Sequence, residues 1–315
     1  MGEKEISQTR ETPIVVTPFF EIPILGKFSR KNVIIEDTKE TIPRSPVLQR
    51  RIDEIWKEEK RKAARSGIKF ENRPSVVLIS RKLENGKLYL KLGRGMYKDF
   101  IGVLNPTIRN QHPEFIHQHL IVSSVIETKD GYFTLNERSQ KVREYHKWLG
   151  SFGGVGDVAD VDRQGKINPF QWALTEISEE SGIQFQEINS LKCLGIVKDK
   201  FPGFTEEVIM FAAKTYLTKS EIEEKQGKME LEEGPSVFLP QKPDEISKKV
   251  LWFSKIMVPD AAAILALLGR QKFGEEWFRY VIGRLRRRGN TYSHLTEKQR
   301  RELEERLILR FAKLT

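Results

Sequence analysis

The sequence predicts an α/β fold, and three observations predict it. Short runs rich in β-branched and aromatic residues occur at 75–80, 87–92, 120–127 and 132–135, and two more follow at 191–198 and 207–216. One capped helix, beginning at 169, lies between these two groups of strands, and a second apolar helix begins at 259. Strands and helices that alternate in this way are typical of a sheet covered by helices.

Composition limits the class of protein. The chain has 315 residues, of which 38% are hydrophobic, which suffices for one large domain or two small ones. The single cysteine, Cys193, forms no disulfide within the chain, so we expect a reducing, cytoplasmic location. The first residues lack the apolar core of a signal peptide, and no apolar run is long enough to span a membrane. The net charge of +10 favours a polyanionic ligand, although it also serves solubility.

The N-terminal part combines strands with one long helix. Residues 14–20 and 33–35 are predicted strands separated by prolines and charges. A helix is expected from Pro46 to about Ser66-Gly67, with a stripe formed by Val47, Ile52, Ile55 and Trp56. Asn85-Gly86 predicts a tight hairpin between 75–80 and 87–92, whereas 94–103 is expected to lead into a loop.

Later elements follow from similar signals. Residues 129–131 form the expected turn between strands 120–127 and 132–135, and Pro202-Gly203 marks the turn between 191–198 and 207–216. A short charged helix or loop is predicted near 220–226, and 230–247 is expected to be irregular because it is rich in Glu, Pro and Ser. Pro259-Asp260 opens the helix that continues through 261–268.

The C-terminal residues predict a helical hairpin. Its first helix covers 275–288, and its second begins at Thr296. The first helix ends in a basic cluster of Arg284, Arg286, Arg287 and Arg288. This cluster is compatible with binding nucleic acid or a membrane surface, with a homo-oligomer interface, or with a solvated basic face.

The central helix carries the candidate catalytic residues. Asn168 is a suitable N-cap before Pro169, Gly182 is placed to end the helix, and its apolar side contains Phe170, Leu174 and Ile177. Glu176, Glu179 and Glu180 are spaced i, i+3 and i+4, so their carboxylates are expected to converge. Because like charges repel, a divalent cation such as Mg²⁺ explains the cluster, although a solvated acidic face also fits.

The segment T-E-I-S-E-E-S-G-I (175–183) resembles the second half of the Nudix box, R-E-U-x-E-E-x-G-U, in which U is a bulky aliphatic residue. Thr175 stands where that family has an arginine, and the positions of the G-x5-E half hold Val161 and Ile167. A glycine pair, Gly153 and Gly154, lies further upstream. The pattern therefore fits a box with extra residues in its loop, 157–168. The resemblance implies a Nudix-type α/β/α sandwich with a mixed sheet, an N-terminal α+β subdomain (1–115), a Nudix-like domain (116–274) and a C-terminal helical extension (275–315).

Several short motifs resemble one branch of that family, the Nudix motif 22 type, which hydrolyses UDP-glucose and UDP-galactose to UMP and a sugar 1-phosphate. The motifs are I-D-E-I-W-K-E-E (52–59), Y-K-D-F-I-G (97–102), R-S-Q-K-V (138–142), the glycine pair and L-G-I-V (194–197). Their order matches over roughly residues 45–270. The resemblance thus implies a Mg²⁺-dependent or Mn²⁺-dependent hydrolase of a nucleoside diphosphate sugar.

The resemblance also implies roles for individual residues. Glu176, Glu179 and Glu180 would hold the metal against the diphosphate, and one of them is also a candidate general base. Glu206 or Glu207 is a candidate fourth carboxylate or base, with an exposed strand end as the alternative. Arg138 is expected to contact phosphate or uracil, unless it is a surface residue, and Gly153 and Gly154 to let the backbone approach the substrate. One of Asp157, Asp160 and Asp162 would replace the missing box glutamate, unless they only solvate the loop.

Tyr97, Asp99 and Phe100 are expected to join the subdomains rather than to bind substrate.

Two other functions remain open. Thr175 and the missing first half of the box also fit a non-catalytic Nudix-fold module that binds a nucleotide or RNA. The basic C-terminal cluster fits, less well, an RNA-processing enzyme.

Overall fold

The computed structural model describes residues 15–17, 20–41, 44–65, 71–111, 118–138, 148–158, 166–199, 207–229, 234–252 and 257–289. The described residues form the following elements: β1 (Val15–Val16), β2 (Phe20–Phe28), β3 (Val33–Thr41), α1 (Pro46–Arg65), β4 (Pro74–Glu84), β5 (Lys87–Met96), α2 (Tyr97–Leu104), α3 (Pro106–Gln111), β6 (Gln118–Glu127), β7 (Tyr132–Glu137), β8 (Leu149–Gly150), α4 (Pro169–Ser181), β9 (Ile188–Asp199), β10 (Glu207–Thr215), α5 (Lys219–Gln226), β11 (Ser236–Pro240), α6 (Pro243–Trp252), α7 (Pro259–Phe273) and α8 (Glu275–Gly289).

The sheet is mixed, which confirms the predicted α/β class. Its main path runs β1-β2-β9-β10-β6-β4-β5-β3, and β7 branches from β6 to join β8 and β11. β6 pairs in parallel with β10, and β3 pairs in parallel with β5, whereas the other pairs are antiparallel. Strands of the predicted N-terminal subdomain (1–115) therefore continue the same sheet through β6.

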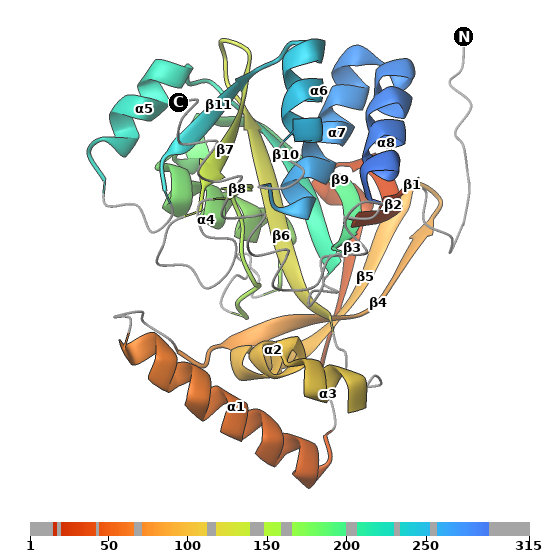
Figure 1. The fold of residues 1–315 in the computed structure, drawn as a ribbon, viewed down its shortest axis with the longest axis vertical. Helices are drawn as coiled ribbons and strands as arrows, with labels where there is room; N and C mark the ends of the chain where they lie inside the picture. The colour runs from red at the N-terminus through yellow and green to blue at the C-terminus, as the bar shows by residue number, and fades with distance from the viewer. Residues whose placement is uncertain are drawn as a thin grey trace.

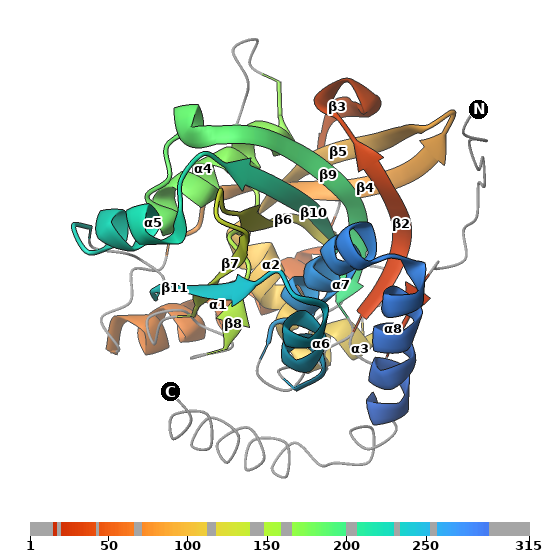
Figure 2. The same ribbon diagram turned by 90° about the horizontal axis from the view of Figure 1, so that it is seen from above.

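Helices cover both faces of the sheet (Figures 1 and 2). On one face, α6, α7 and α8 share a core with apolar side chains of β2, β6, β9 and β10. Most of α7 is buried there, because residues 261–268 are apolar on every side. On the other face, α4 packs Phe170, Trp172 and Ala173 against β4, β6 and β10. The sheet thus separates α4 from α8.

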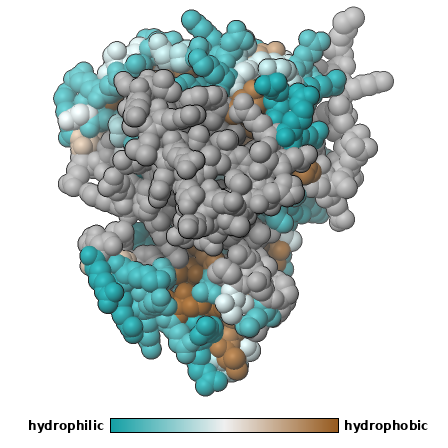
Figure 3. Space-filling model, in the orientation of Figure 1, coloured by the Kyte–Doolittle hydropathy of each residue, from teal (hydrophilic) through white to brown (hydrophobic). Residues whose placement is uncertain are grey.

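A smaller layer of helices lies at one end of the sheet (Figure 1). α1 buries Leu48, Ile52 and Ile55 against α2 and α3, while its outer surface is hydrophilic (Figure 3). The predicted stripe was wrong at Val47, which is 64% exposed. Leu48, Ile52 and Ile55 are spaced i, i+4 and i+7, and this register places Val47 on the outer side.

Local signals set several boundaries as predicted. Asn85 and Gly86 both have positive φ, 50° and 70°, which is the backbone that a two-residue hairpin turn requires. Two predictions were wrong. Residues 230–247 contain β11 and the start of α6, and 94–103 contains most of α2. β11 pairs with β7, so a long-range partner supplies order that its own composition does not indicate.

The second helix of the predicted C-terminal hairpin lies outside the described residues. Its first helix is α8, which contributes Phe278, Val281, Ile282 and Leu285 to the core that it shares with α7. Among the described residues, no helix combines the length and the apolar character that a membrane span requires. The predicted domain boundaries at 115 and 274 stay predictions.

Candidate functional site

The glycine pair lies directly against β6. Backbone hydrogen bonds join Ser124 to Phe152 in both directions, and the amide of Val122 donates to the carbonyl of Gly154 at 3.1 Å. A Cβ atom placed on Gly153 would lie 2.0 Å from the carbonyl oxygen of Val122, far closer than two such atoms approach. Residue 153 must therefore be glycine if the segment is to keep this distance from the strand.

α4 brings two of the predicted glutamates to this segment. The side chain of Asn168 accepts from the amide of Phe170 at 3.1 Å, Pro169 occupies the first turn, and Gly182 ends the helix with φ 76°. The buried side of the helix includes Ile177 and also Glu180. This side differs from the predicted apolar stripe, because Leu174 is only half-buried.

Glu180 is a buried carboxylate held by two N–H donors. Its Oε2 accepts from the amide of Gly153 at 3.1 Å and from Nδ2 of Asn136 at 3.1 Å, and the residue is 8% exposed. Hydrogen bonds to a charged oxygen are roughly twice as strong as neutral ones. The end of α4, the glycine pair and β7 are therefore joined through this one side chain.

Glu176 lies beside the second glycine. Nε1 of Trp172 donates to Oε1 of Glu176 at 3.1 Å, and a Cβ on Gly154 would lie 2.9 Å from the same oxygen. The absence of a side chain at Gly154 thus leaves room for the carboxylate. Glu179, by contrast, is exposed. Of the three predicted glutamates, Glu176 and Glu180 meet at the glycine pair, and Glu179 faces solvent.

Arg138 is placed close to this group. It follows β7 two residues after Asn136, and both side chains lie over Gly150, where an added Cβ would be 2.7 Å from Oδ1 of Asn136 and 3.1 Å from Cγ of Arg138. Glycine at 150 therefore leaves space for both side chains. Arg138 and Asn136, which donates to Glu180, are thus on the same side of β7.

Glu207 lies in a different setting. It opens β10 and forms an ion pair with Arg81 of β4 at 2.6 Å, with 4% of its side chain exposed. The alternative of an exposed strand end was wrong for Glu207, because this carboxylate is buried.

Other predicted site residues lie elsewhere. Glu206 lies outside the described residues, as do Asp160 and Asp162. Asp157 pairs with Ser75 through a β-bridge, and the hydroxyl of Thr175 donates to the carbonyl of Gln171 at 3.2 Å.

A second buried polar group lies on the opposite face of the sheet, and no sequence pattern indicates it. Asp260, at the start of α7, accepts from the hydroxyls of Ser123 at 2.5 Å and Ser151 at 2.8 Å. The amide of Val258 also donates to the carbonyl of Leu149 at 2.9 Å. The start of α7 is thereby anchored to β6 and to the segment that leads into the glycine pair.

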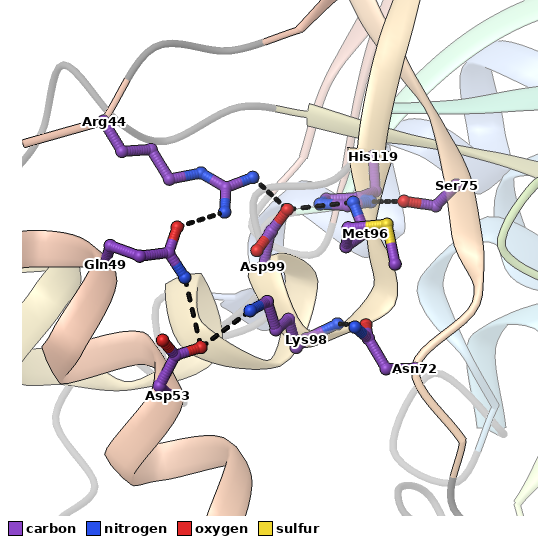
Figure 4. Close-up of polar contacts among 9 residues, drawn as sticks. All are labelled: Arg44, Gln49, Asp53, Asn72, Ser75, Met96, Lys98, Asp99 and His119. Carbon is purple, nitrogen blue, oxygen red and sulfur yellow. Dashed lines mark hydrogen bonds and ion pairs between the residues drawn. The ribbon is translucent and has the colours of Figure 1, made fainter. Parts of the chain in front are cut away.

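Asp99 connects the segments around the helices at the end of the sheet (Figure 4), and its predicted role of joining the subdomains stays a prediction, because the partners described below both lie within 1–115. Its carboxylate pairs with Arg44 and accepts from the amide of Met96 at 2.8 Å. Burial raises the pKa of Asp99 above its usual value, although the Arg44 charge acts in the opposite direction. Gln49 of α1 contacts both Arg44 and Asp53, so the same network continues into that helix (Figure 4).

Within the part of the chain that the structure describes, no group of three or more His, Cys, Asp or Glu side chains is arranged to hold a metal ion. Magnesium in enzymes is often bound by only one or two protein carboxylates, with water and substrate phosphates as the other ligands. Glu176 and Glu180, which meet at the glycine pair, fit that smaller ligand set.

Comparisons with known proteins give structural likenesses. No protein-family model matches the chain, and no curated protein matches its sequence. Similar solved structures include the MutT protein from Methanosarcina mazei Go1 (16% identity, 49% of this chain, 95% of that chain, TM-score 0.34). They also include RenU, a Nudix hydrolase from M. smegmatis (10% identity, 49% of this chain, 86% of that chain, TM-score 0.31). A third is the C. elegans Ap4A hydrolase (15% identity, 50% of this chain, 97% of that chain, TM-score 0.31). Because these TM-scores are below 0.5, these structures support no statement about the activity of this chain.

Proposed function

We propose that this chain is a Nudix-type pyrophosphohydrolase that cleaves the diphosphate of a nucleoside diphosphate sugar, such as a UDP-sugar, with Mg²⁺ or Mn²⁺ as cofactor. One observation carries the proposal: of two carboxylates four residues apart on α4, Glu180 accepts from the amide of Gly153 and Glu176 lies in the space that a side chain on Gly154 would take. Two carboxylate side chains beside a backbone without side chains form a site that suits a divalent cation and an extended diphosphate. The T-E-I-S-E-E-S-G-I resemblance supports the same assignment.

The residues have separate tasks in this proposal. Glu176 and Glu180 would hold the cation, which when bound would neutralise phosphate charge and lower the pKa of water. Asn136 and the amide of Gly153 fix the orientation of Glu180 through their hydrogen bonds. Arg138, on the same side of β7 as Asn136, contacts the diphosphate. The exposed Glu179 completes the ligand set from the edge of the site or acts as the base.

Glu207 has a more restricted role. Its ion pair with Arg81 has an N–O distance of 2.6 Å and lies in a buried position. If this carboxylate took a proton from water, the Arg81 guanidinium would lose its anionic partner at a position away from solvent, which is costly. In the proposed enzyme, Glu207 therefore holds Arg81 at the start of β10, and proton transfer is assigned to the glutamates of α4.

The test is a Mg²⁺-dependent phosphate-release screen of UDP-sugars, ADP-ribose, dinucleoside polyphosphates and NADH, with a phosphatase to release phosphate from the products. Glu180→Gln should lower kcat by about a hundredfold or more while the fold is kept, because the amide oxygen can still accept from Gly153. Glu223→Gln, on the exposed surface of α5, is the matched control and should retain full activity. Full activity of the Glu180→Gln variant would overturn the assignment.

A non-catalytic nucleotide-binding module is the second candidate. Thr175 favours it, because its hydroxyl is bonded to the backbone of α4 and supplies no charge to orient the glutamates. In that case nucleotide binding, measured by calorimetry, would be independent of Mg²⁺ and no substrate in the screen would be turned over.

A further inference from the structure

α8 is buried on one side only. Phe278, Val281, Ile282 and Leu285 pack into the core shared with α7, so this side of the helix fixes its orientation. The opposite side is exposed and is separated from α4 by the sheet (Figure 2). A ligand on this outer surface is thus remote from the candidate catalytic residues.

The outer side of α8 carries an aromatic ring followed by two arginines. Tyr280 is 54% exposed, and Arg284 and Arg287, at i+4 and i+7, are exposed as well. Residues with this spacing form one stripe along a helix, and the two arginines differ by about 4.5 Å along the axis. Gly283 lies three residues after Tyr280 on the same helix, and a Cβ added there would meet no atom within 4 Å, so the surface beside the stripe is open.

The charge of α8 is not balanced within the described residues. Its ion pairs lie in the first turn, where Glu275 contacts Arg270 at 2.6 Å and Arg279 at 3.4 Å. Within the described part of the chain, no ion pair reaches Arg284 or Arg287. These two guanidinium groups are therefore available to an anionic partner.

The choice of basic residue also matters. α8 contains five arginines and no lysine, although the whole chain has 24 arginines and 30 lysines. Either side chain would serve solubility, but the planar guanidinium group binds phosphate through two parallel hydrogen bonds and stacks on aromatic rings. The exclusive use of arginine therefore favours recognition of phosphate over simple solvation.

We propose that the outer face of α8 (Tyr280, Arg284 and Arg287) binds single-stranded nucleic acid. Arg284 and Arg287 contact phosphates, and Tyr280 stacks on an unpaired base. A duplex would satisfy the arginines, but its bases are already stacked and offer no face to the tyrosine ring. Stacking of this kind tolerates any base, so we expect little sequence preference.

The experiment measures binding of the full chain to a fluorescein-labelled single-stranded RNA of about 15 nucleotides by anisotropy at several salt concentrations. Tyr280→Ala should weaken binding about fivefold to a hundredfold, whereas Tyr280→Phe should remain within about twofold of wild type because it keeps the ring. Arg284→Gln/Arg287→Gln should reduce the slope of log K against log salt by about 1.4, or 0.7 for each phosphate contact. Point variants are needed because α8 is part of the core.

The matched control removes the same charge elsewhere. Lys60→Gln/Arg61→Gln lies on the exposed surface of α1 and should leave both the affinity and the salt slope near those of wild type. Equal losses in the two double variants would mean that only net charge matters, and would refute the proposal. Absence of RNA binding, tighter binding to an equivalent duplex, or binding to phosphatidylserine vesicles in place of RNA would refute it as well. None of these outcomes bears on the hydrolase test, which uses Glu180→Gln.

Discussion

Gly153→Ala is the substitution whose effect the structure defines best. The added Cβ would lie 2.0 Å from the carbonyl oxygen of Val122, which belongs to the backbone of β6 and has no rotamer to move into. The φ angle of Gly153 is not positive, so alanine suits its backbone and the conflict is purely steric. The segment must therefore move away from the strand.

The expected loss in free energy of unfolding follows from the contacts that this movement disrupts. Overpacking a core position costs about 1–3 kcal/mol. Displacement of residue 153 also lengthens the 3.1 Å bond from its amide to Glu180, and a hydrogen bond to a charged group contributes about 1.5–3 kcal/mol. We expect the free energy of unfolding to fall by about 3 kcal/mol or more, which is a large share of the roughly 5–15 kcal/mol of an ordinary protein.

The assay is urea unfolding followed by circular dichroism, with two other glycines as comparators. Gly154→Ala would meet only the end of the flexible Glu176 side chain at 2.9 Å, so it should cost less than about 1 kcal/mol. Gly283→Ala, in α8, meets no atom within 4 Å and should stabilise the chain by about 0.5–1 kcal/mol through helix propensity. If Gly153→Ala unfolded within about 0.5 kcal/mol of wild type, the close approach of this segment to β6 would be refuted.

Three further predictions concern other positions. Asn136→Ala removes a buried donor to Glu180 and should lower the free energy of unfolding by about 2 kcal/mol in the same urea assay; no change would contradict the 3.1 Å contact. Because burial raises the pKa of Asp99 in the folded chain, its contribution to stability is full below the unfolded value near 3.8 and is lost as pH rises through the folded pKa. As pH rises from about 3.8 through the folded pKa, the free energy of unfolding of Asp99→Asn should therefore increase relative to that of wild type. Urea unfolding at several pH values measures this difference, and a difference that does not depend on pH would argue against a raised pKa of Asp99. Burial raises the pKa of Cys193 to about 12, so the folded chain should not react with a thiol reagent at neutral pH until urea unfolds it, and rapid labelling of the native chain would show that the thiol is accessible.

What the sequence determined by itself was local. Asn168, Pro169 and Gly182 set the ends of α4, and Asn85-Gly86 set the β4–β5 hairpin, because caps and tight turns depend on the backbone preferences of a few adjacent residues. The i, i+4 spacing of Glu176 and Glu180 likewise places their side chains next to each other on any α-helix.

Only the tertiary structure decided which carboxylate is buried and what holds it. Asn136 is 44 residues from Glu180 in sequence, and in isolation a polar residue in β7 indicates a solvated strand face. The link from Asp260 to Ser123 and Ser151 spans 137 and 109 residues, and β11 is ordered by its pairing with β7. Such contacts form where distant segments pack on the same strand, so no local pattern indicates them. The same packing placed Glu179 in solvent and Glu180 against Gly153, although the two residues are neighbours in the sequence.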